Sequence, residues 1–141
     1  MTEEPRRFDT KIAVLLRDDL ASWQRVNVTA FLVSGLGSVR PEVIGEPYID
    51  AGGVTYLPMI RQPVLVLTAD AAQLTVSHRR AVDRALDVSV FIDAMFTTTH
   101  DEANRAAVAA VPTAELPLAG FAVFGPKNAV DKVTKGARLL S

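Results

Sequence analysis

The unbroken apolar run from Ile12 to Leu16 constrains the fold of this chain more than any other feature. A strand that is covered on both faces reads as a continuous apolar run, whereas a half-exposed strand alternates between apolar and polar residues. The run therefore predicts the central strand of a sheet with helices on both faces. Arg17, Asp18 and Asp19 follow it. Because ligands of open α/β sheets bind at the carboxyl ends of the strands, these charges indicate the edge where a site is expected.

A helix is expected next, from about Ser22 to Ser34, with Gly35 as a stop signal. At about 100° per residue its apolar side chains fall on two arcs, and Asn27 and Ser34 lie in the gap between them. The pattern predicts a mostly buried helix that carries two polar side chains. The single tryptophan, Trp23, is either a packing anchor, which we favour, or a platform for a stacked ligand.

The rest of the chain alternates apolar strands and helices around one insertion. Strands are expected at 63–68, 88–92 and 118–124, and helices at 70–86, 103–110 and 126–136. Periodicity is lost in the insertion at about 36–62, where Tyr48-Ile49 and Val54–Tyr56 flank a glycine-containing turn that is typical of a β-hairpin. This order predicts an α/β fold. We expect a three-layer α/β/α sandwich with a four-stranded, mainly parallel (mixed) sheet and an inserted β-hairpin.

Composition narrows the classes of protein. A length of 141 residues with 49% hydrophobic content predicts a single domain, which we expect over residues 10–141. The polar N-terminal sequence predicts a flexible tail over residues 1–9. The net charge of -1 gives no general attraction to nucleic acid, so a tRNA partner would need a local basic patch. No apolar run has the length of a membrane span, and no motif for a cofactor or a metal is present. The lack of cysteine excludes thiolate catalysis and fits a cytoplasmic protein.

Six segments together carry a resemblance to a known family. They are VLLRDDLASWQRVNVTAFLVSGL, GEPYIDAGG, YLPMIRQPVLV, VFIDAMF, HDEANRAAVAAVP and GPKNAVDKVTKGARLL. Over almost its whole length the chain resembles the bacterial family numbered two thousand among the domains of unknown function, which shares the fold of type II peptidyl-tRNA hydrolases. Motifs of the hydrolases themselves correspond to Arg17–Leu20, Asp93-Ala94 and Gly125-Pro126. The resemblance therefore implies a peptidyl-tRNA hydrolase type II-like scaffold.

The hydrolase resemblance also implies a catalytic site. Its aspartate, and the threonine four residues later, match Asp93 and Thr97, whereas a lysine and a glutamine of the first helix fall on Asn27 and Phe31. In a hydrolase, Asp93 would activate water, Thr97 would bind the substrate carbonyl and Asn27 would position a polar group. The neutral hydrogen bond of asparagine is about half as strong as a charge-assisted one, so its presence argues against inherited activity. A strand-end turn explains Asp93 equally well.

Further polar residues near this edge are candidate ligand-binding residues. They are Arg17, Asp19, Gln24, Ser34, His100 and Asn104. Arg17 either turns into the cleft or pairs with Asp18 or Asp19, and hydrogen bonding at the helix entry is the favoured explanation of the two aspartates. His100 and Asn104 belong to a polar segment that is either a helix N-terminus, with Thr99 in capping-box position, or a lid over Asp93. His78 is expected to be a packed histidine.

Three functions remain open. We favour a binding domain for a small ligand or a partner, on a hydrolase-like scaffold whose catalytic set is largely replaced. The alternative is a diverged hydrolase of peptidyl, aminoacyl or other acyl ester or amide substrates that uses Asp93 to activate water. The third is a homodimer subunit that associates through Met59-Ile60 or the inserted hairpin. The first two differ in whether Asp93, Thr97 and Asn27 share one water-accessible pocket.

Overall fold

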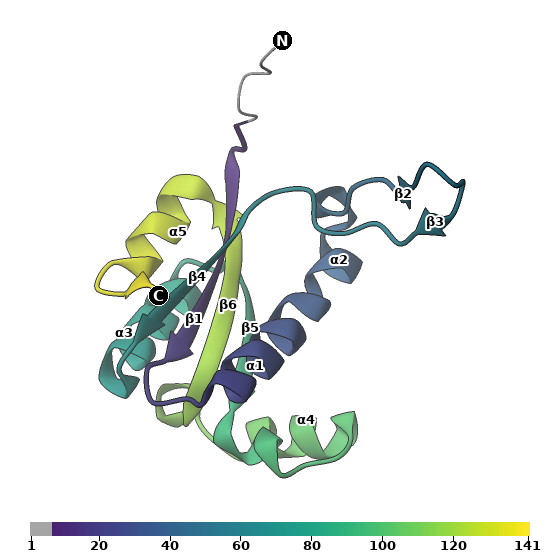
Figure 1. Ribbon diagram of the computed structural model, residues 1–141. Helices are drawn as coiled ribbons and strands as arrows, with labels where there is room; N and C mark the ends of the chain where they lie inside the picture. Colours follow the sequence, from purple (N-terminus) through teal and green to yellow (C-terminus); the bar gives the residue numbers. More distant parts are fainter. Residues whose placement is uncertain (1–6) are drawn as a thin grey trace.

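A five-stranded mixed sheet forms the centre of the computed structural model, which describes residues 7–141 (Figure 1). The strands lie in the order β5-β6-β1-β4-β7. They are β1 (Thr10–Arg17), β4 (Val64–Ala69), β5 (Asp87–Ile92), β6 (Leu118–Pro126) and β7 (Arg138–Leu139). The apolar run that predicted a central strand is β1, which lies in the middle of the sheet.

The strand directions differ from the expected mainly parallel arrangement. Only β1 and β4 pair in parallel, and the pairs β1-β6, β5-β6 and β4-β7 are antiparallel. For the two pairs that β6 makes, the cause lies in α4 (Asp101–Ala109), which stays beyond the end of the sheet and does not cross its face (Figure 1). The chain therefore enters β6 where it left β5, and Leu118 pairs with Ile92. The fifth strand, β7, was not expected because a pair of residues leaves no periodic pattern.

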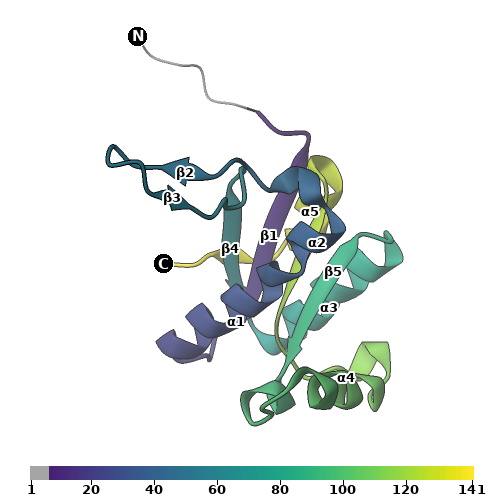
Figure 2. The same cartoon turned by 90° about the vertical axis from the view of Figure 1, so that its right-hand side faces the viewer.

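Helices cover both faces of the sheet and confirm the three layers. The helix α1 (Ser22–Ser34) packs on one face, and α3 (Ala71–Asp83) and α5 (Lys127–Thr134) pack on the other (Figures 1 and 2). Alternate residues of β1 serve the two cores. Ala13 and Leu15 belong to the core beneath α3 and α5, and Val14 and Leu16 to the core beneath α1. All four side chains are buried, as the unbroken apolar run predicted.

The insertion contains the predicted hairpin. After α2 (Leu36–Val39) and a single 3-10 turn at Pro41–Val43, the chain forms β2 (Tyr48–Ile49) and β3 (Thr55–Tyr56). These strands pair antiparallel in a separate two-stranded sheet. The turn between them uses Gly53 at φ 86°, a left-handed conformation that glycine adopts without strain. Figure 2 shows the hairpin projecting from the body of the molecule.

The helix α1 is less buried than its two apolar arcs predicted. Of its residues, Val28 and Leu32 are buried, whereas Trp23, Val26 and Phe31 are exposed. The reason is that the sheet covers one side of α1, and no described element forms a further layer on the other. The expectation of a mostly buried helix was therefore wrong, and an apolar outer face is available to a ligand.

The ends of α3 and its histidine agree with the sequence more closely. Asp70 caps the helix, because its side chain accepts the backbone N–H of Gln73 at 2.8 Å, and the helix ends before Ala85, which has φ 53°. His78 is buried, and its ring packs edge-on against Phe121 with centroids 5.6 Å apart. Burial lowers the pKa of His78 below its ordinary value. The interpretation as a packed histidine is confirmed.

The N-terminal tail predicted over residues 1–9 falls mainly on residues 1–6, which lie outside the described residues. The residues that follow already contact the domain. The guanidinium carbon of Arg61 lies 5.5 Å from the centroid of the Phe8 ring, and the carbonyl of Asp9 accepts the backbone N–H of Lys127. Within the described chain, no helix combines the length and the apolar character needed to cross a membrane.

Candidate functional site

Residues of α1, β5 and α4 line a cleft of about 870 Å³, which we call the α1–α4 cleft. Figure 2 shows how these three elements are arranged. Its aromatic lining consists of Trp23 and Phe31 from α1, Phe91 from β5 and Phe96 from the turn that follows β5. Its polar lining includes Asn27, Ser34, His100 and Asn104. The cleft exists because α4 stands beyond the end of the sheet and leaves the outer side of α1 uncovered.

The aromatic side chains of the cleft are in contact with one another. Ring centroids are 6.0 Å apart for Trp23 and Phe96, 4.9 Å for Phe96 and Phe91, and 6.0 Å for Phe91 and Phe31. Trp23 is 63% exposed and Phe31 is 58% exposed. The preference for Trp23 as a packing anchor was therefore wrong, because the residue lies on the side of α1 that faces away from the sheet. It is positioned as a stacking surface.

Asn27 lies between the two exposed aromatic residues on the same face of α1. The spacing of four residues from Trp23 to Asn27, and from Asn27 to Phe31, places the three side chains in one row. The Asn27 amide forms no hydrogen bond with another described residue, so both its donor and its acceptor remain available to a ligand. Ser34 continues the lining, but its hydroxyl already donates to the carbonyl of Phe31 at 2.7 Å.

The opposite wall of the cleft presents hydrogen-bond donors. His100 caps α4, and its Nδ1 accepts the backbone N–H of Ala103 at 3.2 Å. An accepting Nδ1 places the hydrogen of the neutral ring on Nε2, which therefore donates. The hydroxyl of Thr98 contacts Oδ1 of Asn104 and the carbonyl of Met95, and the Asn104 side-chain N–H groups donate to no other described residue. The prediction that Thr99 caps this helix was wrong, because the side chain of His100 accepts a backbone N–H of the first turn.

The charges at the cleft compensate each other. Asp101 and Arg105 both line it, and they form an ion pair across one turn of α4. Their opposite charges leave the lining close to neutral. Within residues 7–141, no group of three or more His, Asp or Glu side chains is arranged to hold a metal ion.

A second polar cluster lies at the carboxyl ends of β1 and β5. Arg17 donates from Nη1 to Oδ1 of Asp93 at 2.8 Å, and from Nε to Oδ1 of Asp19 at 2.6 Å. It also donates to the carbonyl of Leu118, the first residue of β6. Burial disfavours the guanidinium charge, but the hydrogen bonds to Asp19 and Asp93 outweigh it and raise the pKa of Arg17. The cluster joins three strands at one edge of the sheet.

The residues predicted to be catalytic do not all line the α1–α4 cleft. Asn27 lines the α1–α4 cleft, but Asp93 and Thr97 are not part of its lining. Asp93 is held by Arg17, and the Thr97 hydroxyl donates to the carbonyl of Ala94 at 3.0 Å. Asn27 therefore stands apart from the other two members of the set.

The residues predicted to bind a ligand divide between the two places. Ser34, His100 and Asn104 join Asn27 in the α1–α4 cleft, whereas Arg17 and Asp19 belong to the cluster at the sheet edge. Gln24 is at neither, because its Oε1 accepts the backbone N–H of Ala21 and closes the first turn of α1. Arg17 pairs with Asp19 at the strand end, the simpler of the two roles considered for it, and it also pairs with Asp93.

The aromatic part of the cleft was not predicted as a site. Phe31 was counted among the apolar side chains of a mostly buried helix, and Phe96 was given no role. The pattern that could have revealed the site is the row of Trp23, Asn27 and Phe31, because an amide between two aromatic residues on one helix face does not suit a buried interface. Phe91 and Phe96 could not be added from sequence, since they reach the cleft through the packing of β5 and the turn after it.

Comparisons with known proteins identify the family to which this chain belongs. The sequence matches the family described as "Protein of unknown function (DUF2000)" over residues 10–141. The fold is similar to the solved structure of Atu0240, a protein of unknown function from Agrobacterium tumefaciens strain C58, with a TM-score of 0.93 and 45% identity, covering 96% of this chain and 100% of that one. A comparison with curated proteins gave no match. The chain therefore belongs to the DUF2000 family.

Proposed function

We propose that this protein is a binding domain that takes up a small, neutral, planar ligand in the α1–α4 cleft. The observation that carries the proposal is the pair of exposed aromatic residues, Trp23 and Phe31, on either side of Asn27. Aromatic rings offer large contact areas at a low cost in conformational entropy, and an amide between them can fix the orientation of a stacked ring.

The remaining lining narrows the chemistry of the ligand. His100 and Asn104 present donors, so the ligand should carry acceptors such as ring nitrogens or carbonyl oxygens. The pairing of Asp101 with Arg105 favours a ligand without net charge. The cleft of about 870 Å³ lies within the usual range for small-molecule sites, roughly 300–1,000 Å³. A neutral heteroaromatic compound, such as a nucleoside or an aromatic amide, meets these requirements.

Binding is better supported than hydrolysis. A general base must reach the proton that it abstracts, directly or through one water molecule. Asp93 lies outside the lining of the α1–α4 cleft, and its Oδ1 is engaged by Arg17 at 2.8 Å. The alternative, in which Asp93 activates water against an acyl ester or amide, therefore draws no support from this arrangement.

We also infer that the scaffold is related to that of type II peptidyl-tRNA hydrolases. The shared motifs at Arg17–Leu20 and Asp93-Ala94 support this relation, because both lie at strand ends that meet at one edge of the sheet. A tRNA partner has weaker support. The arginines of α3 are engaged within the protein, since Arg79 pairs with Asp83 and Arg80 donates to the carbonyl of Lys135.

Intrinsic fluorescence tests the binding proposal directly, because Trp23 is the single tryptophan and lines the cleft. A panel of adenosine, guanosine, uridine and nicotinamide, extended by a library of planar heteroaromatic fragments, would be titrated into the protein. We expect saturable quenching or a spectral shift with at least one neutral compound. Asn27→Ala and His100→Ala should each weaken that binding by about tenfold, the loss of one hydrogen bond of roughly 1.4 kcal/mol.

Asp93→Asn is the matched control, because it alters a polar residue near the same end of the sheet but outside the cleft lining. It should leave the affinity unchanged. Loss of binding in this variant, together with release of acyl product from a peptidyl-tRNA mimic by the wild type, would favour the hydrolase alternative. The binding proposal fails if no compound gives a saturable signal, or if Asn27→Ala and His100→Ala bind as the wild type does.

A further inference from the structure

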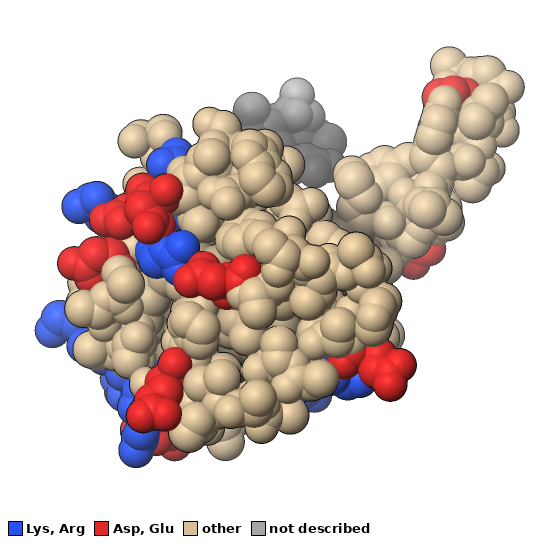
Figure 3. All heavy atoms as spheres, turned by 90° about the horizontal axis from the view of Figure 1, so that it is seen from below, with Lys and Arg blue, Asp and Glu red and all other residues tan. Residues whose placement is uncertain are grey.

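The hairpin and its flanks form an apolar projection, which we call the arm (residues 47–59). Its large apolar side chains are between 50% and 85% exposed, and they are Tyr48, Ile49, Val54, Tyr56, Leu57 and Met59. Asp50 is the single charged residue of the arm. Figure 3 shows the arm reaching away from the body as an almost uncharged surface. Exposed apolar groups gathered in this way indicate an interaction surface.

The arm is held in a defined conformation. At its base, the backbone N–H of Gly45 donates to the carbonyl of Met59, and the backbone N–H of Arg61 donates to the carbonyl of Val43. At its tip, the carboxylate of Asp50 accepts the backbone N–H groups of Gly52 and Val54 and the hydroxyl of Tyr56. An isolated two-stranded hairpin is marginally stable in water, so these bonds pre-organise a segment that has little core of its own. The only charge of the arm is thus used to shape it.

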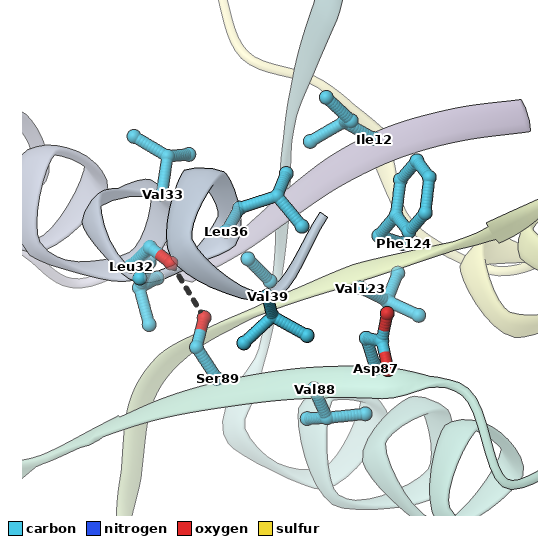
Figure 4. Close-up of a pocket in the computed structure, with 12 residues that line it drawn as sticks. Ile12, Leu32, Val33, Leu36, Val39, Asp87, Val88, Ser89, Val123 and Phe124 are labelled. Atoms are coloured by element: carbon cyan, nitrogen blue, oxygen red, sulfur yellow. Dashed lines mark hydrogen bonds between the residues drawn. The ribbon is translucent and has the colours of Figure 1, made fainter. Parts of the chain in front are cut away.

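A second unpartnered apolar feature lies close to the base of the arm. This apolar cleft, of about 290 Å³, is lined by Ile12, Leu36, Val39, Val88 and Phe124, among others (Figure 4). Val39 is 60% exposed, and it belongs to α2, the helix that leads into the arm. Asp87 is the charged residue of the described lining, and it is ion-paired with Arg40 at 2.6 Å. The cleft therefore offers apolar contact without an unpaired charge.

We propose that two copies of this chain exchange arms, so that the arm of each copy lies in the apolar cleft of the other. A projection and a hollow of the same apolar character on one chain are self-complementary. The arm leaves the body on the side where α2 lies (Figures 1 and 2). Because Val39 of α2 also lines the apolar cleft, a two-fold axis can bring both arms to both clefts. Such an interface closes at two copies and buries the same surface on each.

The area available is sufficient for a stable dimer. Each of the six apolar side chains of the arm contributes on the order of 100 Å² of accessible surface when it is half to fully exposed. The arm therefore offers roughly 600 Å² of apolar surface. If each partner covers half of that area and loses an equal area of its own surface, two arms bury about 1,200 Å² in total, above the roughly 1,000 Å² expected of a biological interface. The arm has no basic residue that would favour an anionic membrane surface instead.

Measurement of molar mass in solution tests the arm exchange. Light scattering coupled to size-exclusion chromatography, over a dilution series, should give a dimer for the wild type. Leu57→Glu in the arm and Val39→Lys in the apolar cleft should each halve the mass, because each places a charge in an apolar contact. Both residues are exposed in the monomer, so circular dichroism should show an unchanged fold.

Mixing the two variants provides the decisive step. In a mixed dimer, one arm and one cleft are native, and the other pair brings the carboxylate introduced in the arm of the first variant against the ammonium introduced in the cleft of the second. The dimer mass should therefore return. Val76→Glu on the exposed side of α3 is the matched control and should remain dimeric.

Two outcomes would overturn the proposal. A monomeric wild type would mean that the arm serves another partner. A dimer that survives both Leu57→Glu and Val39→Lys would mean that another face holds the copies together.

Discussion

Replacement of Gly120 by alanine tests whether β6 is packed as closely as the structure requires. A β-carbon at this position would lie 2.8 Å from the carbonyl oxygen of Leu15, 3.1 Å from Leu16 Cδ2 and 3.3 Å from Val28 Cγ1. The two leucine atoms belong to β1, with which β6 pairs, and Val28 is a buried residue of α1. A backbone carbonyl in the middle of a sheet cannot rotate away. Gly120→Ala must therefore move β6 from β1, or α1 from the sheet.

The expected cost follows from that crowding. Insertion of one carbon into a close-packed interior costs about 1–3 kcal/mol, and because the nearest atom is backbone we expect the upper half of that range, about 2–3 kcal/mol. For a chain of this size, a loss of that order lowers the Tm by roughly 5–10 °C. Urea unfolding followed by circular dichroism measures the free energy of unfolding, and calorimetry measures the Tm.

Gly35→Ala is the matched control. No atom lies within 4 Å of a β-carbon at Gly35, and its backbone, at φ -81° and ψ -13°, suits alanine. We expect no loss of stability, or a gain of about 0.4–1 kcal/mol from the reduced entropy of the unfolded chain. The reasoning fails if the free energy of unfolding of Gly120→Ala lies within about 0.5 kcal/mol of the wild-type value, because a change that small is usual for surface substitutions.

Three further predictions concern single side chains. Burial lowers the pKa of His78, so the unfolded chain binds a proton at this residue more readily than the folded chain does. The neutral His78 therefore contributes its full stability at a pH above 6.5, the ordinary pKa of histidine, and this contribution declines as the pH falls below 6.5. The urea concentration at the midpoint of unfolding should fall as the pH is lowered from about 7 to about 5. The midpoint of His78→Gln should fall less steeply over that interval. Asp70→Ala should cost about 1 kcal/mol in the same assay through loss of the α3 cap, and a change near zero would refute the cap. Asp93→Asn should cost at most about 1 kcal/mol, because the carboxylate is 47% exposed and its bond to Arg17 is screened by water; a loss several times larger would contradict that view.

Local patterns predicted the elements that depend on residues close in the chain. The apolar run of β1, the span of α1 and the paired ends of the hairpin all follow from short-range spacing. The packed state of His78 was also predictable, since it shares a helix face with Leu74. The same reasoning failed for Trp23 and Phe31, because a helical pattern reveals which side chains share a face but not whether another element covers that face.

The amino-acid order alone was enough to indicate an α/β domain with a buried central strand, an inserted hairpin and membership of the DUF2000 family, because these depend on periodicity, turn residues and motifs within short segments. The mixed strand directions needed the folded chain, since the reversal of β6 depends on α4 staying beyond the end of the sheet. The fifth strand needed it as well, because two residues leave no periodic pattern. The candidate site needed it too. Asn27 and His100 are far apart in sequence, and only the packing of α1, β5 and α4 makes them line one cleft, while it leaves Asp93 bound to Arg17 outside it.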